Sequence, residues 1–235
     1  MTNTKGRLYG IGVGPGDPEL LTLKAFRLLK SASVVAYQSA DNHPSVARSI
    51  VASYLTDDQI EVPFHFPRAL DPHEAKPLYD RAIVPIAEHL AAGHDVVVLC
   101  EGDPLFYGSF MYLFTRFADQ YHTEVVPGVS SPMACASAIG IPISYRNDIF
   151  SVLPATLSAD VLATQLVNAD AAAIIKLRRH FSKVREVLRS LGLSSRARYI
   201  ERATMAEQRI ISLDEVEADR VPYFSMILLP TKVQL

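Results

Sequence analysis

An unbroken run of apolar residues, Val96 to Cys100, is followed one residue later by the turn sequence Gly102-Asp103-Pro104. A continuous apolar run rich in β-branched residues is typical of a strand that is buried on both faces of a parallel sheet. Gly102 can adopt backbone angles closed to other residues, and Pro104 fixes its own φ, so a rigid loop should follow the strand. An ordinary turn would also explain these three residues. Because ligands bind at the carboxyl ends of strands in open α/β sheets, this loop is the first candidate site.

The composition allows a large core and excludes several classes of protein. Of the 235 residues, 49% are hydrophobic and 20% are charged, which is typical of a globular chain with one large domain or two smaller ones. The 25 acidic and 23 basic side chains nearly balance and no basic run appears, so we expect no nucleic-acid partner. No apolar run approaches the roughly 18 residues of a membrane helix, and the polar start lacks the apolar segment of a signal peptide. We therefore expect a cytoplasmic protein with no membrane partner.

The chain has two cysteines, Cys100 in the buried run and Cys135 in a stretch of small residues. This usage predicts reduced thiols rather than a disulfide framework. We expect no metal site.

The first half of the chain alternates between strand and helix patterns. Strands are predicted at residues 7–13, 34–37, 60–64, 96–100 and 123–126. Helices are predicted at residues 44–54, 74–92 and 110–118, with a proline-rich loop or flap at residues 65–73. Such alternation requires right-handed crossovers between strands and therefore predicts a mostly parallel sheet.

The glycine-rich segment of residues 12–19 (GVGPGDPE) follows the first strand. A dinucleotide fingerprint would have its third glycine at position 17, where this chain has Asp17, and Pro15 would remove a backbone donor from the phosphate cradle. The pattern thus disfavours a nucleotide diphosphate site. With Pro18 after it, Asp17 is predicted to cap a helix that begins at Pro18, and a ligand contact by Asp17 is the alternative.

The pattern changes after the predicted hinge Pro127-Gly128. A helix of small residues is predicted from Ser131 to Ala138, and further helices at residues 158–167 and 181–191. Strands are predicted at residues 150–153, 171–177, 197–200, 209–211 and 223–229. The last strands are too close in sequence for helical crossovers, so at least one pair must be antiparallel. We therefore expect two α/β domains, residues 1–128 with a mostly parallel sheet and residues 129–235 with a mixed sheet.

Three motifs occur in order along the chain: GVGPGDPELLTLKA at residues 12–25, GDPLFYG at residues 102–108 and VPGVSS at residues 126–131. Together they resemble the tetrapyrrole (uroporphyrinogen and precorrin) methyltransferases. The resemblance implies a two-domain fold, S-adenosyl-L-methionine as cofactor, a small-molecule tetrapyrrole substrate and a homodimer. Residues 47–51, the flap at residues 66–67 and the segment ERATMAEQR at residues 201–209 are most similar to the precorrin-2 C20-methyltransferases of cobalamin biosynthesis.

The resemblance also implies which residues bind the cofactor. The loop after residue 101 would contact its methionine and ribose parts, with Asp103 as the principal side chain. The implied cofactor residues are Gly102, Asp103, Phe106, Ser130, Ser131, Leu177, Ala203, Thr204, Ser225 and Met226. At Lys176-Leu177 the chain departs from the tyrosine-methionine pair that is common in the family.

For the substrate, the resemblance implies that Pro15, Gly16 and Asp17 form the floor of a tetrapyrrole trough. A carboxylate-rich tetrapyrrole needs local cations, because the net charge of the chain is −2. Arg146 is the first candidate. Further candidates are Arg68, Lys176, Arg178, Arg179 and His180, and for each of these residues a solvated structural role is the alternative.

Methyl transfer is an in-line displacement at a sulfonium carbon, so the protein mainly has to align the reacting groups and place acceptor oxygens near the positive sulfur. Backbone carbonyls and Asp103 can do so. The catalytic proton acceptor stays open among Tyr107, Asp17 and a water molecule. Alternative functions are a sibling enzyme acting at another carbon or on cobalt-factor II, an RNA ribose methyltransferase or diphthine synthase, and a non-catalytic tetrapyrrole-binding protein.

Overall fold

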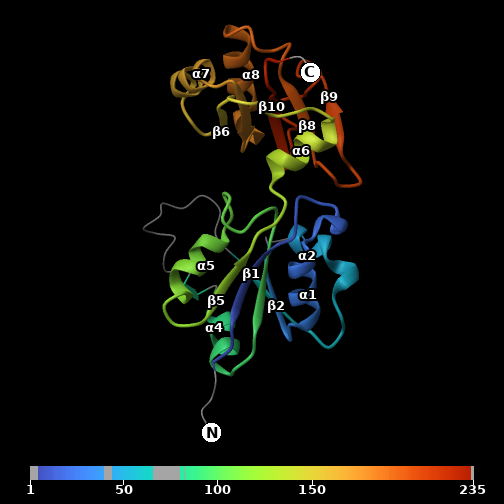
Figure 1. Cartoon of the computed structure of the whole chain (residues 1–235), viewed down its shortest axis with the longest axis vertical. Coiled ribbons are helices and arrows are strands. Elements are labelled where there is room, and N and C mark those ends of the chain that lie inside the picture. Colours follow the sequence, from blue (N-terminus) through green and yellow to red (C-terminus); the bar gives the residue numbers. More distant parts are fainter. Residues whose placement is uncertain (1–4, 40–43, 66–79, 82, 234–235) are drawn as a thin grey trace. The chain divides into compact units, whose positions relative to one another are not determined.

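The computed structural model describes residues 5–39, 44–65, 80–81 and 83–233. The chain divides into two compact units, Met1–Ser130 and Ser131–Leu235 (Figure 1). Each unit has its own five-stranded sheet with helices packed against it. The predicted α/β class, with one sheet in each half of the chain, is confirmed.

The sheet of the first unit is parallel throughout, with the strand order β3-β2-β4-β1-β5. Its strands are β1 (Leu8–Gly12), β2 (Val34–Gln38), β3 (Ile60–Phe64), β4 (Val96–Cys100) and β5 (Thr123–Val126). The central strand β4 is buried along its whole length, as its unbroken apolar run predicts. The loops that follow the five strands therefore meet at one edge, the carboxyl edge of this sheet.

Helices cover both faces of the first sheet (Figure 1). They are α1 (Leu23–Ser31) and α2 (Val46–Ile50) on one face, and α4 (Val84–Ala91) and α5 (Phe110–Phe117) on the other. Side chains of β4 alternate between the two resulting cores. Val97 and Leu99 pack with α1 and α2, whereas Val98 and Cys100 pack with α4 and α5. Burial of both faces explains why β4 contains no polar residue.

The first helix begins later than the sequence predicts. Asp17 caps only a short 3₁₀ turn, Pro18–Leu20, where its Oδ1 accepts a hydrogen bond from the Glu19 N–H at 2.8 Å. Thr22 has an extended backbone and caps α1, since its Oγ1 accepts from the Ala25 N–H at 3.2 Å. Capping by Asp17 is thus observed, but the prediction that α1 begins at Pro18 is wrong, because extended residues interrupt the helical pattern.

The sheet of the second unit is mixed, as predicted, with the strand order β6-β7-β10-β8-β9. Its strands are β6 (Phe150–Pro154), β7 (Ala171–Ile175), β8 (Arg198–Glu201), β9 (Arg209–Ile211) and β10 (Ser225–Leu229). β6 and β7 are parallel, and every other neighbouring pair is antiparallel. Because β10 runs against both β7 and β8, one edge of this sheet holds the carboxyl ends of β7 and β8 and the start of β10.

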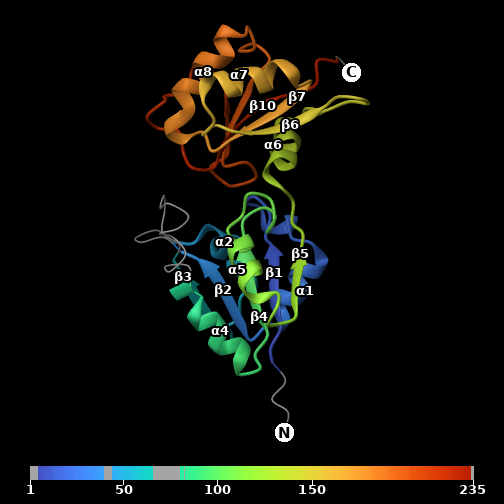
Figure 2. The ribbon, with the colours of Figure 1, turned by 90° about the vertical axis from the view of Figure 1, so that its left-hand side faces the viewer.

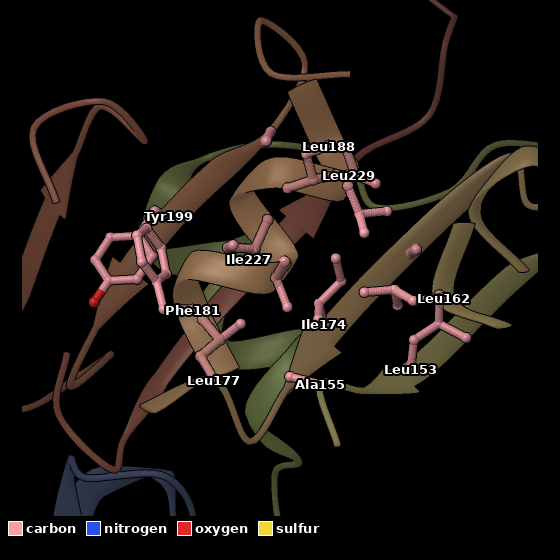
Figure 3. Packing of buried hydrophobic residues seen from close by; sticks show 14 of the residues in the cluster. Leu153, Ala155, Leu162, Ile174, Leu177, Phe181, Leu188, Tyr199, Ile227 and Leu229 are labelled. Atoms are coloured by element: carbon pink, nitrogen blue, oxygen red, sulfur yellow. The ribbon is translucent and has the colours of Figure 1, made fainter. Parts of the chain in front are cut away.

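Helices α7 (Ala159–Asn168) and α8 (Phe181–Ser190) lie on one face of the second sheet, and α6 (Ser131–Ile139) lies on the other (Figure 2). The larger core lies under α7 and α8. There Leu162 and Phe181 of the helices pack with Ile174 and Ile227 of the strands (Figure 3). Cys135 of α6 belongs to the smaller core on the opposite face.

Most predicted elements are present with ends shifted by a few residues. The predicted helix at residues 44–54 is α2 followed by a 3₁₀ turn, Ala52–Tyr54. Residues 66–73 of the flap, which include Arg68, and the first residues of the helix predicted at 74–92 lie outside the described residues. Within the described part of the chain, no helix has the length and apolar character to cross a membrane.

Candidate functional site

Two loops at the carboxyl edge of the first sheet are joined through their backbones. The N–H of Val13 donates to the carbonyl of Cys100 at 2.9 Å. Gly14 and Gly102 then form an isolated antiparallel bridge, with N···O distances of 2.8 and 3.3 Å. Their φ angles of +77° and +64° are rare for other residues. The motif glycines thus fix the loop after β4 against the loop after β1.

A third glycine, Gly128 after β5, closes the same edge. A methyl group on Gly128 would lie 2.1 Å from the carbonyl oxygen of Gly102 and 2.7 Å from Cα of Gly12. A methyl group on Gly12 would lie 2.5 Å from the same carbonyl oxygen. Only glycine permits such a close approach of three backbones. The loops after β1, β4 and β5 therefore form one rigid unit.

Asp103 ties the loop after β4 to the loop after β5. Its Oδ2 accepts a hydrogen bond from the Gly128 N–H at 3.1 Å, and its Oδ1 accepts from the Leu105 N–H at 2.9 Å. A carboxylate has about four acceptor positions, so these two bonds leave capacity for another donor. Asp103 therefore has a structural role that the sequence did not reveal, at the position predicted to contact the cofactor.

The loop after β4 continues through a strained residue. Tyr107 has a φ of +55°, which is uncommon outside glycine, and its ring lies edge-on to that of Phe106 with 5.0 Å between centroids. The hydroxyl of Ser109 donates to Oε1 of Gln38 at 2.8 Å, which links the loop to the end of β2. Strain of this kind is concentrated at functional sites, which favours this loop as a binding element.

Glu101, between β4 and Gly102, is a titratable residue of this edge that the sequence interpretation missed. Desolvation by burial raises the pKa of its carboxyl above the usual value, and hydrogen bonds from the backbone of Glu101 and Ala47 oppose this shift. Burial also raises the pKa of the Cys100 thiol. The signal in the sequence was a carboxylate directly after a fully apolar strand.

The predicted substrate residues Pro15, Gly16 and Asp17 are partly exposed and lie between the Gly14 bridge and the 3₁₀ turn. Ser130, also partly exposed, follows β5. The first unit thus places these four residues at the same edge as Gly102, Asp103 and Phe106.

In the second unit, most of the predicted cofactor residues lie at the edge where β7 and β8 end. Ala203 and Thr204 follow β8, while Ser225 and Met226 begin β10, and Ser225 pairs with Glu201 of β8. Four non-glycine residues at this edge have positive φ: Lys176 at +60°, Arg178 at +30°, Arg202 at +47° and Thr204 at +67°. This concentration of unusual backbone conformations marks the edge as the candidate site of the second unit.

The remaining three predicted residues of the second unit are Leu177, Ser131 and Arg146. The side chain of Leu177 is fully buried in the larger core, so any contact at the edge falls to its backbone (Figure 3). Ser131 is the first residue of α6. Arg146 precedes β6 and lies at the opposite edge, because the Thr231 N–H after β10 donates to the carbonyl of Ile143 at 3.0 Å. The structure therefore does not bring Arg146 together with the residues around Thr204.

Basic residues follow β7 at the candidate edge of the second unit. They are Lys176, Arg178, Arg179 and His180. Desolvation, and then the positive charges of Lys183 and Arg179, lower the pKa of His180. Basic residues thus gather at this edge although the whole chain carries a net negative charge.

The family model described as tetrapyrrole (corrin/porphyrin) methylases matches residues 7–218 of the chain. The chain is 42% identical to the cobalamin biosynthesis protein CobIJ of Mycobacterium tuberculosis, over 97% of its own length and 46% of that relative. It therefore spans about half the length of CobIJ. It is 39% identical to a precorrin-2 C(20)-methyltransferase of a Sinorhizobium species, over 96% of its own length and 95% of the relative.

A solved structure has the same fold. The uroporphyrin-III C-methyl transferase of Thermus thermophilus, complexed with S-adenyl homocysteine, is similar to this chain with a TM-score of 0.67 and 28% sequence identity. The similarity covers 95% of this chain and 97% of the other.

Proposed function

The chain belongs to the tetrapyrrole (corrin/porphyrin) methylase family, and on this premise we propose that it methylates precorrin-2 at C20 with S-adenosyl-L-methionine, giving precorrin-3A in cobalamin (vitamin B12) biosynthesis. One observation carries the substrate assignment. It is the similarity, over nearly the full length of both chains, to the Sinorhizobium protein that is named for this reaction.

The chemistry of the carboxyl edge of the first sheet suits this cofactor, which has hydroxyl groups and a positive sulfur. Asp103 keeps acceptor capacity beyond its two backbone hydrogen bonds, and that capacity suits a hydroxyl donor. In the solved relative, the bound compound is S-adenyl homocysteine. We assign to cofactor binding the residues Gly102, Asp103, Phe106, Ser130, Ser131, Leu177, Ala203, Thr204, Ser225 and Met226.

When bound, the cofactor supplies a methyl group on a positively charged sulfur. The main task of the chain is to hold the methyl donor and the acceptor carbon in line. A strong catalytic base is less important for this reaction than this alignment. The glycine packing of Gly12, Gly102 and Gly128 serves this purpose, because a loop fixed on both sides keeps its carbonyl groups and Asp103 in one orientation.

Pro15, Gly16, Asp17 and Arg146 are the proposed substrate contacts. The first three belong to the loop that is bridged to Gly102. Arg146 offers an exposed guanidinium, which lies 5.0 Å from the centre of the Tyr145 ring and can bind a carboxylate with two parallel hydrogen bonds.

A homodimer in the cytoplasm is also part of this proposal. The family resemblance and a hydrophobic content of 49% in two modest units support association. Both cysteines are free and buried, which suits a reducing compartment. Light scattering should give roughly twice the chain mass of 25.9 kDa, whereas a single-chain mass at micromolar concentration would contradict the dimer.

The activity is tested by incubating the purified protein with precorrin-2 and S-adenosyl-L-methionine that carries a ¹³C-labelled methyl group. We expect NMR to locate the new methyl at C20, and a reaction without precorrin-2 is the control. A new methyl at another carbon would identify a sibling enzyme, and a parallel reaction with cobalt-factor II tests the metal-containing substrate. If the tetrapyrrole binds while the label stays on the cofactor, the protein is a non-catalytic tetrapyrrole-binding protein.

A further inference from the structure

Three residues form a row across the second sheet at the edge where β8 ends. Arg209 of β9 pairs with Glu201 of β8, and Glu201 pairs with Ser225 of β10. Directly paired residues direct their side chains to the same face of a sheet. Glu201 is only 4% exposed, so its carboxylate is buried between an arginine and a serine.

Glu201 is held in place from the core. Tyr199, two residues earlier on the same strand face, is fully buried, and its hydroxyl donates to Oε1 of Glu201 at 2.7 Å. Its ring packs edge-on against Phe181 with 5.6 Å between centroids, and its hydroxyl is directed away from the aliphatic side chains (Figure 3). Desolvation and the hydrogen bond to Glu201 raise the pKa of Tyr199, so the hydroxyl remains a donor at neutral pH.

Two guanidinium groups approach the other oxygen of Glu201. Nη1 of Arg209 lies 3.4 Å from Oε2, and Nη1 of Arg202 lies 3.8 Å from it. In a regular strand, Arg202 would point to the face opposite to Glu201. Its φ of +47° departs from strand geometry and allows the guanidinium to return to the carboxylate. This conformation costs free energy, so the surrounding structure must enforce it.

The loop after Arg202 supplies that constraint. The Arg202 N–H donates to the carbonyl of Phe224 at 2.8 Å, and the Arg202 carbonyl accepts from the Met205 N–H at 3.0 Å. The Thr204 N–H donates to Oε1 of Gln208 at 2.7 Å. The short turn between β8 and β9 is therefore held by its own hydrogen bonds, which keeps both arginines near Glu201.

The cluster has more positive than negative charge. Within the described residues, Glu201 is the one carboxylate within salt-bridge distance of Arg202 or Arg209. The two arginine side chains are 39% and 60% exposed, and both distances exceed the roughly 2.7–2.9 Å of a strong charge-assisted hydrogen bond. Each guanidinium has five donors, so Glu201 uses only a small part of this capacity and the rest is open to solvent or to a ligand.

We infer that Arg202 and Arg209 bind a carboxylate of a ligand, and that Glu201 positions the two guanidinium groups for it. The inference rests on the proposed function, because a carboxylate-bearing tetrapyrrole is a ligand that such a pair recognises. The amino-acid end of the cofactor presents the same chemistry. A guanidinium held from one side by Glu201 keeps a planar edge for two parallel hydrogen bonds to a second carboxylate.

Calorimetric titration of the full chain distinguishes the two ligands. Precorrin-2 and S-adenosyl-L-homocysteine are titrated separately into the unaltered protein, Arg202→Ala and Arg209→Ala. Loss of a charge-assisted pair should weaken one of the two ligands roughly ten- to hundredfold and leave the other nearly unchanged. Arg202→Lys and Arg209→Lys should lose less, because they keep the charge without the planar fork. The ligand that loses affinity identifies the source of the carboxylate.

Arg189→Ala is the matched control. Arg189 also pairs with one carboxylate, Asp214 at 2.7 Å, but it lies near the end of α8, away from the edge where β8 ends. This variant should bind both ligands normally. Circular dichroism checks that each variant folds. If Arg202→Ala does not fold, the test depends on Arg209→Ala, because the side chain of Arg209 is the more exposed of the two.

Normal affinity of both alanine variants for both ligands would overturn the inference and leave the proposed function intact. If the unaltered protein does not bind precorrin-2, the proposed function is overturned instead, and the titrations with S-adenosyl-L-homocysteine alone then decide the inference. These two failures are therefore distinguishable.

The positioning role of Glu201 is tested by a double-mutant cycle with Glu201→Gln, which keeps an oxygen for Tyr199 but removes the charge. The loss of affinity caused by Arg202→Ala should be at least about threefold smaller in the Glu201→Gln background than in the unaltered protein. In that background the guanidinium of Arg202 is no longer oriented by a charged partner. Equal costs in the two backgrounds would remove this role from Glu201. A merely structural effect on stability would leave the ratio of affinities unchanged.

Discussion

The carboxylate of Asp103 accepts hydrogen bonds from the backbone of both Leu105 and Gly128. Because Asp103 lies in a loop outside the core, its position alone suggests that Asp103→Ala would leave the fold intact. The two hydrogen bonds, however, predict that this variant is less stable. We expect Asp103→Ala to reduce the free energy of unfolding by about 1–3 kcal/mol and to weaken cofactor binding severely. Asp103→Asn, which keeps one acceptor oxygen, should lose less stability. Urea denaturation and titration with S-adenosyl-L-homocysteine measure the two effects, and unchanged cofactor affinity in Asp103→Ala would remove Asp103 from the site.

Glu101 should make the stability of the protein depend on pH. Burial raises the pKa of its carboxyl from the ordinary value of 4.5, so the folded protein retains this proton at a pH where the unfolded chain has lost it. The free energy of unfolding therefore falls as the pH rises from 4.5 through the folded pKa. Glu101→Gln should be more stable than the unaltered protein at pH 7. Thermal unfolding at several pH values tests this, because the advantage of Glu101→Gln should vanish below about pH 4.

Where the loops after β1, β4 and β5 meet, Gly12 and Gly128 are required by close contacts rather than by backbone angle. A Cβ on Gly128 would overlap the carbonyl oxygen of Gly102 at 2.1 Å. Gly128→Ala should therefore cost about 3 kcal/mol or more in stability, because the backbones of two other loops would have to move. Gly192→Ala is the control, since Gly192 has a φ of +67° and no atom within 4 Å of the added Cβ, and should cost only about 1 kcal/mol. Equal losses, measured by chemical denaturation, would contradict the close approach.

The strand pattern was predictable because burial acts on each residue separately. The run from Val96 to Cys100 is apolar because both of its faces are covered. The unbroken apolar pattern was therefore enough to indicate a central parallel strand. The start of α1 was not predictable in the same way. Asp17 and Thr22 are both good caps, and only the extended backbone of Leu21 and Thr22 decides that Thr22 begins the longer helix.

Within the candidate site, the sequence predicted the place of those residues that directly follow a strand. Gly102 and Asp103 follow β4 directly, so their place at the edge was evident from the sequence. The pairing of Glu201 with Arg209 and Ser225 depends on strand register, which joins residues that are distant in the chain. The hydrogen bond from Gly128 to Asp103 likewise depends on the neighbouring positions of β1, β4 and β5 in the sheet.

At the scale of the whole molecule, charge is distributed unevenly. The chain carries a net charge of −2, yet the edge of the second unit where β7 and β8 end carries five cationic side chains. They are Lys176, Arg178, Arg179, Arg202 and Arg209. The net negative charge of the chain would repel a ligand with many carboxylates. Attraction must therefore come from local cationic groups. Local exposed groups are also those that salt screens most strongly.

This distribution predicts different salt dependences for the two ligands. A tetrapyrrole with many carboxylates should bind more weakly as the salt concentration rises, because exposed pairs further apart than a Debye length of about 8 Å are screened at physiological ionic strength. The cofactor has charges of both signs and a small net charge, so its affinity should change little. Arg146→Ala should weaken the tetrapyrrole and spare the cofactor, since its exposed guanidinium lies at the edge of the second sheet opposite to the proposed cofactor residues around Thr204. Titrations of both ligands across a range of salt concentrations measure these slopes. Equal slopes, or an Arg146→Ala variant with unchanged tetrapyrrole affinity, would contradict local electrostatic recognition.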